Sequence, residues 1–320
     1  MEMKQTNINK FPKPQKNETG WPWTVESKSL PKTQNDGSQW PKISIVTPSY
    51  NQGAFLEETI RSVLLQNYPN LEYIVIDGGS TDESVNIIKK YEEWITYWIS
   101  EPDKGQSDAI NKGFEKATGK YGNWINSDDL LAKDSLYNAA NFLADAKYKT
   151  LFIGQCIMTD KTRQKERINS CTIQSFEELI DIKNYWRNGN SIAQQNVFFD
   201  LNSFRDVGGL NVNNHYAMDY ELWGNLLLNG NKIEYLNFPV GIFRQYDGQK
   251  ISNQIATTNS LLNSAKRLVI KQRGSLIKKL KLWIRLTIYQ YNFCLRYFVG
   301  FSQNRIRIRK ITGLLFSSES

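Results

Sequence analysis

The chain has 320 residues, of which 40% are hydrophobic and 22% charged. This composition is typical of a globular protein, and the length suits one large or two ordinary domains. The three cysteines, Cys156, Cys171 and Cys294, are widely spaced, and His215 is the single histidine. Neither a disulfide scaffold nor a histidine-rich metal site is therefore expected.

The positive charge is concentrated near the C-terminus. Residues 262–320 contain 13 Lys or Arg and one acid, whereas the residues before them carry a net charge of −4. The net charge of +8 and the pI of 9.1 therefore describe a basic tail on a mildly acidic body. The first 20 residues contain no apolar run of the kind found in a signal peptide or membrane anchor, so we expect a cytoplasmic protein.

Composition divides the chain into three segments. Residues 1–41, rich in Pro, Lys, Asn and Gln, are predicted to form a flexible arm whose tryptophans, Trp21 and Trp23, could dock on the body. Residues 42–250 are predicted to form the main globular domain. Residues 251–320 are predicted to form a basic, amphipathic helical tail.

From residue 42 on, short apolar runs alternate with segments of helical periodicity. Strands are predicted at residues 43–46, 73–76, 94–99 and 121–125, each followed by a helical stripe. Ser80 and Glu83 have the spacing of a capping box, which predicts the start of the second helix. Successive β–α units of this kind indicate a doubly wound parallel sheet with helices on both faces. Two further strands are predicted at residues 151–157 and 196–199.

Ligands of such a sheet bind beyond the carboxyl ends of the strands, near the point where the strand order reverses. The strand-to-helix loops begin at Pro48, Asp77, Glu101 and Asn126. The sequence lacks both the G-x-G-x-x-G fingerprint and the P-loop motif, which disfavours these two phosphate sites. Tyr50 offers a flat face for a nucleotide base, although an ordinary turn would have a similar composition.

Two of the loops have residues suited to a phosphate and a metal ion. Lys104 precedes a predicted helix start, whose free amides favour a phosphate, with a solvated polar loop as the alternative. Asn126, Asp128 and Asp129 offer oxygen ligands from one strand end, which suits Mg²⁺ or Mn²⁺ bound together with a diphosphate. Adjacent acids beside an apolar strand are costly unless they are paired or bind metal. We therefore expect a metal at this loop.

Together these segments resemble the inverting family 2 glycosyltransferases. The matching segments are residues 46–53 (VTPSYNQG), 77–82 (DGGSTD), 100–113 (SEPDKGQSDAINKG) and 126–129 (NSDD), and residues 215–223 (HYAMDYELW) are similar to the acidic motif of that family. The resemblance implies an α/β fold of the GT-A type, with a doubly wound, mostly parallel sheet flanked by helices and a C-terminal helical extension. Residues 42–250 would then be the catalytic domain.

The resemblance also implies roles for individual residues. Asp219 matches the catalytic base, with Glu221 in support, and Asp128 matches a metal ligand, with Asn126 in place of the first acid of an Asp-x-Asp triplet. Tyr246 stands where relatives often have a histidine. The residues expected to contact the nucleotide-sugar are Pro48, Tyr50, Asn51, Asp77, Asp103, Gln106, Asp108, Asn126 and Arg244.

The chemistry of sugar transfer requires the same two functions. A cation must stabilise the departing diphosphate, and a carboxylate must take a proton from the incoming hydroxyl. Asp128 would serve the first need and Asp219 the second, and a single in-line displacement would invert the anomeric centre. An acid at a helix start such as Asp219 also complements the helix dipole, and this structural role is the alternative.

The expected function is transfer of a sugar from a nucleotide-diphosphate sugar, with a UDP-sugar as the expected donor and Mn²⁺ or Mg²⁺ as cofactor. The expected acceptor is a saccharide or lipid-linked saccharide in the synthesis of capsule, O-antigen or exopolysaccharide. A nucleic-acid-binding protein and a sugar nucleotidyltransferase are the alternatives. The acidic body disfavours the first, and no nucleic acid partner is expected. The lack of Arg or Lys in residues 48–53 disfavours the second.

The tail suggests a further partner. Residues 274–301 combine apolar and aromatic residues at helical spacing with Lys and Arg mostly on the other side. Arg285 and Arg296 interrupt the apolar run, so it is too short to span a bilayer. Such a helix suits an anionic membrane surface and would attach the protein peripherally to the inner face of the cell membrane. A helix packed on the catalytic domain is the alternative.

Overall fold

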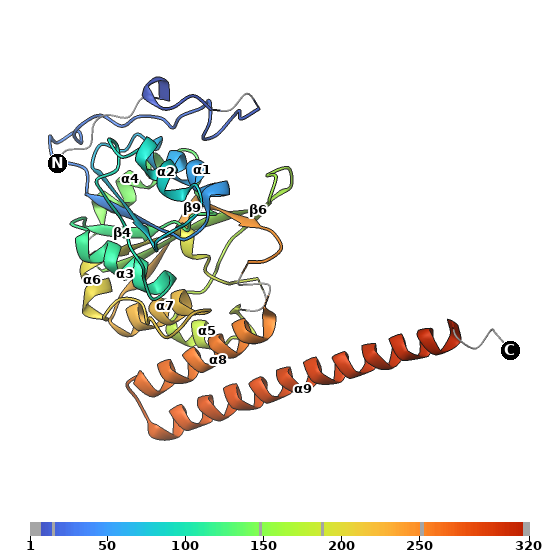
Figure 1. Cartoon of the computed structure of the whole chain (residues 1–320). Coiled ribbons are helices and arrows are strands. Elements are labelled where there is room, and N and C mark those ends of the chain that lie inside the picture. Colours follow the sequence, from blue (N-terminus) through green and yellow to red (C-terminus); the bar gives the residue numbers. More distant parts are fainter. Residues whose placement is uncertain (1–7, 15–16, 147–148, 187–188, 250–252, 316–320) are drawn as a thin grey trace.

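The computed structural model describes residues 8–14, 17–146, 149–186, 189–249 and 253–315, with side-chain surroundings described up to Leu295. One mixed sheet lies at the centre of the molecule (Figure 1). Its parallel half contains β3 (Tyr97–Ser100), β2 (Leu71–Asp77), β1 (Ile43–Ser49) and β4 (Tyr121–Trp124), in that order. It continues through β8 (Val197–Asp200), β6 (Thr150–Asp160), β9 (Lys232–Gln245) and β5 (Leu130–Leu131), with β7 (Glu166–Asn169) paired to β6.

The second half of the sheet is mainly antiparallel. β8 runs antiparallel to both β4 and β6, β7 to β6 and β5 to β9, whereas β6 and β9 are parallel. The helices are α1 (Gly53–Leu64), α2 (Ser84–Lys90), α3 (Gln106–Lys116), α4 (Ser135–Asp145), α5 (Phe176–Ile180), α6 (Leu201–Asp206), α7 (Met218–Leu228), α8 (Gln254–Lys271) and α9 (Leu276–Leu315). Short 3₁₀ turns cover Ile8–Lys10 and Gln194–Asn196.

Alternating residues of the central strands fill two separate cores. Val46 of β1 and Ile74 of β2 belong to the cluster that includes buried residues of α3, α7 and α8. Their neighbours Ile45 and Tyr73 belong to the other cluster, with buried residues of α1 and α4. Because successive side chains of a strand point to opposite faces, strands that are apolar throughout need helices on both sides. The predicted doubly wound architecture is confirmed.

The predicted elements differ from the structure in two details. β3 begins at Tyr97, and Trp94 and Ile95, which we assigned to it, are buried in the turn before it. The predicted capping box at Ser80 is wrong, because α2 begins at Ser84 and the Ser80 hydroxyl donates to Asp77 Oδ1 instead. A side chain that is already bonded to the preceding strand end is not available to cap a helix.

The described part of the N-terminal segment lies along the body, above α1 and α2 in Figure 1. Arg61 of α1 is fully buried, and its guanidinium donates to the backbone oxygens of Pro12, Pro22 and Trp23. The same guanidinium lies 5.4 Å from the ring centre of Phe11 and 5.1 Å from that of Trp23. We expected a flexible arm here. The expected docking of its tryptophans is what the structure shows, because the buried cation needs these carbonyls as partners.

The segment expected to be a tail from residue 251 on divides into two parts. Leu262, Ala265 and Leu268 of α8 are fully buried in the core, and a methyl group at Gly224 of α7 would lie 2.3 Å from Leu268 Cδ1. α8 is therefore part of the body. α9 turns back along α8 and then extends beyond the body (Figure 1). Among the described residues, no helix is long and apolar enough to cross a membrane.

Candidate active site

The strand order reverses between β1 and β4. From β1 the chain proceeds to β2 and β3 on one side and then returns to form β4 on the other. The loops after β1 and β4 therefore leave the sheet at its topological switch point, where open α/β sheets bind ligands.

The loops after β1, β2 and β3 meet at Gly78. A methyl group at this position would lie 2.6 Å from Asp103 Oδ2 and 3.3 Å from Tyr50 Cδ2. The Tyr50 side chain is 62% exposed, so its ring has a face available for stacking. The structure thus brings together Tyr50 and Asp103, two of the residues expected to contact the nucleotide.

Asp77, at the end of β2, links the loops after β2 and β3 through hydrogen bonds. Its carboxylate accepts hydrogen bonds from the Ser80 backbone N–H (2.9 Å), the Ser80 hydroxyl (2.6 Å) and the Ser100 hydroxyl (2.7 Å). Ser80 Oγ also accepts the Asn51 backbone N–H, and Asn51 Oδ1 accepts that of Thr81. Asp77 was expected to hydrogen-bond the base. In the structure the side chain is buried and both oxygens accept hydrogen bonds from these loops, and a contact with the base stays a prediction.

Two other residues expected to contact the nucleotide-sugar are engaged in contacts within the protein. Pro48 is buried within β1. Asp108 accepts the Lys104 backbone N–H at 3.0 Å and lies 3.7 Å from the Lys112 ammonium. Both residues shape the loops that surround the switch point.

The two adjacent acids after β4 have opposite surroundings. Asp129 is fully buried, and its oxygens accept the Arg244 backbone N–H (3.1 Å) and the Asn126 amide (3.3 Å). Burial, reinforced by the neighbouring charge of Asp128, raises the pKa of Asp129 well above its usual range. Asp128 Oδ2 accepts from the Tyr246 hydroxyl (2.9 Å) and from the Gln249 amide (3.1 Å). Asp128 is therefore the acid of this loop that can act on a ligand.

Arg244 braces the same loop from inside. Its side chain is only 2% exposed, pairs with Glu58 and donates to the Asp128 backbone oxygen at 3.0 Å. The Phe55 ring covers it, with the guanidinium 4.8 Å from the ring centre. We expected Arg244 to face the diphosphate. In the structure the guanidinium pairs with the partly buried Glu58 of α1, and a contact with the diphosphate stays a prediction.

The oxygen donors of this loop fit a hard divalent cation. Asp128 Oδ1 has no hydrogen bond among the residues that the structure describes, and Asn126 Oδ1 could exchange its bond to Gln106 for a metal. Within the same residues, no group of three or more His, Cys, Asp or Glu could enclose a metal ion. A cation here would therefore take its other ligands from the substrate and water, as Mg²⁺ commonly does at phosphate sites.

The first turn of α3 connects the loop of Asn126 and Asp128 to α7. Gln106 Nε2 donates to Asn126 Oδ1 at 2.7 Å. The next residue, Ser107, places its hydroxyl 2.7 Å from the sulfur of Met218, which immediately precedes Asp219. The loop of Asp128 and the helix start of Asp219 therefore lie on either side of one helix N-terminus.

Asp219 has the properties of a carboxylate kept partly away from water. Its side chain is half-buried, and Oδ1 accepts its neighbour's backbone N–H, that of Tyr220, at 2.7 Å. Burial raises the pKa of Asp219 to about 6, against the lowering effect of that hydrogen bond. A carboxyl group of this pKa is ionised at neutral pH and is a stronger base than an ordinary aspartate.

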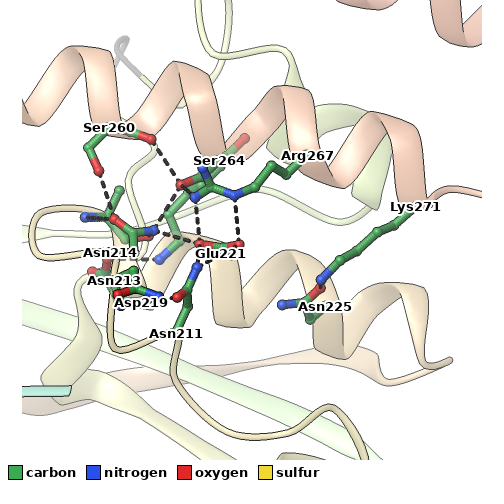
Figure 2. Close-up of polar contacts among 12 residues, drawn as sticks. Asn211, Asn213, Asn214, Asp219, Glu221, Asn225, Ser260, Ser264, Arg267 and Lys271 are labelled. Carbon is green, nitrogen blue, oxygen red and sulfur yellow. Dashed lines mark hydrogen bonds and ion pairs between the residues drawn. The ribbon is translucent and has the colours of Figure 1, made fainter. Parts of the chain in front are cut away.

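Glu221 is fixed by a polar network between α7, α8 and the loop before α7 (Figure 2). Its oxygens accept two hydrogen bonds from Arg267 (3.0 and 2.7 Å), one from Asn214 (2.7 Å) and a longer one from Asn211. Burial opposes ionisation, but the bonds from Arg267 and Asn214 outweigh it and lower the pKa of Glu221. The expected supporting role is therefore one of position, since both oxygens are occupied. A cavity of about 360 Å³ adjoins this network, lined by Asn211, Asn213, Asn214, Ser260, Asn263 and Arg267.

The comparisons with known proteins identify the family of the chain. The model of glycosyl transferase family 2 matches residues 44–207, more than half of the chain, and the chain belongs to this family. It is 36% identical over 121 residues to the putative teichuronic acid biosynthesis glycosyltransferase TuaG of Bacillus subtilis (strain 168), which covers 37% of this chain and 48% of TuaG. The chain thus spans about half the length of that relative.

Two solved structures are similar in fold. S. aureus TarS 1-349, solved in complex with UDP-GlcNAc, has a TM-score of 0.59 at 16% identity over 79% of this chain and 73% of TarS. The mannosyltransferase PcManGT from Pyrobaculum calidifontis, solved with GDP-Man and Mn²⁺, has a TM-score of 0.57 at 17% identity over 83% and 73%. The fold is therefore of the GT-A type. Membership of glycosyl transferase family 2 supports neither alternative considered from the sequence, a nucleic-acid-binding protein or a sugar nucleotidyltransferase.

Proposed function

We propose that this glycosyltransferase transfers a sugar from a nucleotide-diphosphate sugar to an acceptor hydroxyl by a single displacement with inversion. The catalytic unit would be residues 42–250 together with α8, which belongs to the same core. The observation that carries the proposal is the position of α3, whose first turn contacts both the loop of Asp128 and the start of α7.

In the proposed reaction Asp219 is the general base. The acceptor oxygen attacks the anomeric carbon, its proton passes to the Asp219 carboxylate, and the bond from that carbon to the diphosphate breaks. The nucleoside diphosphate leaves with the bonding electron pair. The raised pKa of Asp219 supports this role, because it makes the carboxylate a better proton acceptor. Glu221, with Arg267, would keep the start of α7 in place.

A divalent cation, Mn²⁺ or Mg²⁺, would be held by Asp128 and by Asn126. When bound, it would neutralise the charge that develops on the departing diphosphate. The free Oδ1 of Asp128 supports this assignment. Tyr246 and Gln249 would fix the orientation of the Asp128 carboxylate through their bonds to Oδ2.

The nucleotide would lie over the loops that meet at Gly78. Tyr50 would stack on the base, and Asp103 would contact the nucleoside, while Asn51 and Asp77 hold the loops in shape. Gln106 would contact the diphosphate or sugar from the N-terminus of α3. A UDP-sugar is our proposed donor, supported by the UDP-GlcNAc bound to TarS, and a role in surface polysaccharide synthesis is supported by the name of TuaG.

A screen of nucleotide-sugars in the presence of Mn²⁺ tests the proposal, with release of the nucleoside diphosphate as the readout. We expect one donor class to be turned over in a metal-dependent way. Asp145→Asn, the same chemical change at an exposed position of α4, is the matched control for Asp219→Asn. Turnover that persists in EDTA would contradict the metal role, and equal loss in both variants would contradict the role of Asp219.

A further inference from the structure

The helix α9 is apolar on two opposite sides. Leu286 is buried, and Leu282 and Tyr289 pack against the core. At 100° per residue these three positions lie on one side of the helix, whereas Leu280 and Ile284 point the other way. The exposed stripe consists of Leu276, Ile277, Leu280, Trp283, Ile284, Ile288, Tyr291 and Leu295, with exposed fractions between 38% and 80%.

One side of α9 thus packs on the body, and the opposite side is free to bind a membrane surface, so the two alternatives considered for the tail are compatible. The packed side is held to α8 by polar contacts as well, since Gln290 accepts from Lys266 at 2.7 Å and donates to Asn259 at 2.9 Å. These bonds fix the rotation of the helix about its axis. The stripe is therefore directed mostly away from the body. Among the described residues, α8 reaches it only at its edge, at Trp283, where the Lys266 ammonium lies 5.2 Å from the centre of that ring.

The charges beside the stripe are all positive. Lys281 and Arg285 are exposed and follow one edge of the stripe on the helical wheel. Residues 274–318 contain nine Lys or Arg and no Asp or Glu. A second copy of α9 on this face would therefore bring cations together without any acid, whereas helices that pair through an apolar seam usually have complementary charges beside it.

We propose that α9 binds parallel to an anionic lipid surface, with the stripe in the boundary between head groups and acyl chains. Lys281 and Arg285 would contact anionic head groups, and the amphipathic rings of Trp283 and Tyr291 suit this boundary. The docking itself follows from the helix alone. Its consequence, that the active site is held beside lipid-linked acceptors, rests on the proposed function.

Flotation of the full chain with vesicles tests the docking. Vesicles of phosphatidylcholine with about 30% phosphatidylglycerol are compared with pure phosphatidylcholine, at low and high salt. We expect binding to the anionic vesicles that weakens with salt, because salt screens the attraction between the Lys and Arg side chains and the anionic head groups. Lys281→Gln with Arg285→Gln should weaken binding by about tenfold or more.

The apolar contribution needs a separate variant. Leu280→Asp with Ile284→Asp should abolish flotation, whereas Ile168→Asp, at an exposed apolar position of β7, should leave it unchanged. The unfolding temperature of each variant and its rate of nucleoside diphosphate release are measured without vesicles. Values equal to those of the wild type show that the body is intact. Unaltered flotation of the double variant would overturn the docking, as would a dimer in solution that this variant dissociates. Nucleotide-sugar turnover is independent of these outcomes, so failure of the docking is distinguishable from failure of the proposed function.

Discussion

The indole rings of Trp124 and Trp223 stack in the core, with ring centroids 5.5 Å apart and an interplanar angle of 23°. Both side chains are fully buried. Trp124 ends β4 two residues before Asn126, and Trp223 lies one helical turn after Asp219 on the same side of α7. This pair therefore holds the loop of Asn126 and Asp128 at a fixed distance from the proposed base, Asp219.

The pH dependence of transfer should report the raised pKa of Asp219. The proposed base acts in its ionised form, so kcat/KM should be constant above pH 7 and should fall about tenfold per pH unit below the pKa of about 6. Initial rates from pH 4.5 to 8.5, with the fold checked at each pH, measure this limb. A limb near pH 4, as for an ordinary aspartate, would contradict the buried position of the base.

Gly78→Ala should weaken nucleotide binding. The added methyl group cannot fit 2.6 Å from Asp103 Oδ2, so the Asp103 carboxylate must shift from its place beside Tyr50. We expect KM for the donor to rise by about tenfold with a smaller change in kcat, because uniform binding is lost. The control is Ala144→Ser on α4, a small change away from these loops. A glycine with positive φ, such as Gly37, is unsuitable as a control because alanine would be strained there. An unchanged KM would show that the nucleotide does not lie over these loops.

Asp128→Asn should reduce metal-dependent nucleotide binding, because the carboxylate charge that attracts the cation is lost. Calorimetry with a nucleoside diphosphate, with and without Mn²⁺, should show the metal-dependent gain in affinity largely removed. Tyr246→Phe is the graded comparison. It removes one hydrogen bond to Asp128 Oδ2, and we expect it to cost about 0.5–1.5 kcal/mol of the same affinity. Equal Mn²⁺ dependence in wild type and Asp128→Asn would contradict the metal role.

Glu221→Gln should lower the free energy of unfolding and leave the fall of kcat/KM below pH 6 unchanged. The glutamine cannot accept both bonds from Arg267, so we expect a loss of about 1–3 kcal/mol in the free energy of unfolding. Chemical denaturation measures this, with Glu92→Gln at an exposed position as control. If Glu221→Gln instead removed the acidic limb while stability stayed the same, Glu221 and not Asp219 would be the base.

The sequence predicts the switch-point loops well, and the reason is local. Tyr50, Asp103 and Asp128 lie in the loops that follow β1, β3 and β4, so their place at the edge of the sheet follows from strand order and turn composition. The same applies to Asp219, which precedes an apolar helical stripe. Patterns of period 2 and 3.6 fix these positions without knowledge of tertiary contacts.

Residues that brace the site from a distance are a different case. Glu58 lies on α1, where a polar residue of an amphipathic helix would ordinarily face water, yet it pairs with Arg244 from β9. Gln249 likewise reaches Asp128 from beyond β9. The sequence separation of such pairs exceeds 100 residues, and no local pattern predicts them. Asp77 and Arg244 were expected at the ligand. In the structure Asp77 accepts from the nearby Ser80 and Ser100, and Arg244 donates to the backbone of Asp128.

The most direct test of the account is turnover of Asp219→Asn, measured beside its affinity for the donor nucleotide. Asparagine can still accept the Tyr220 backbone N–H but cannot take a proton from the acceptor. We predict that kcat falls by about 10²–10⁴-fold, the usual contribution of a general base, while the Kd of the nucleotide with Mn²⁺ stays within about threefold of wild type. Turnover near that of the wild type would contradict the central claim.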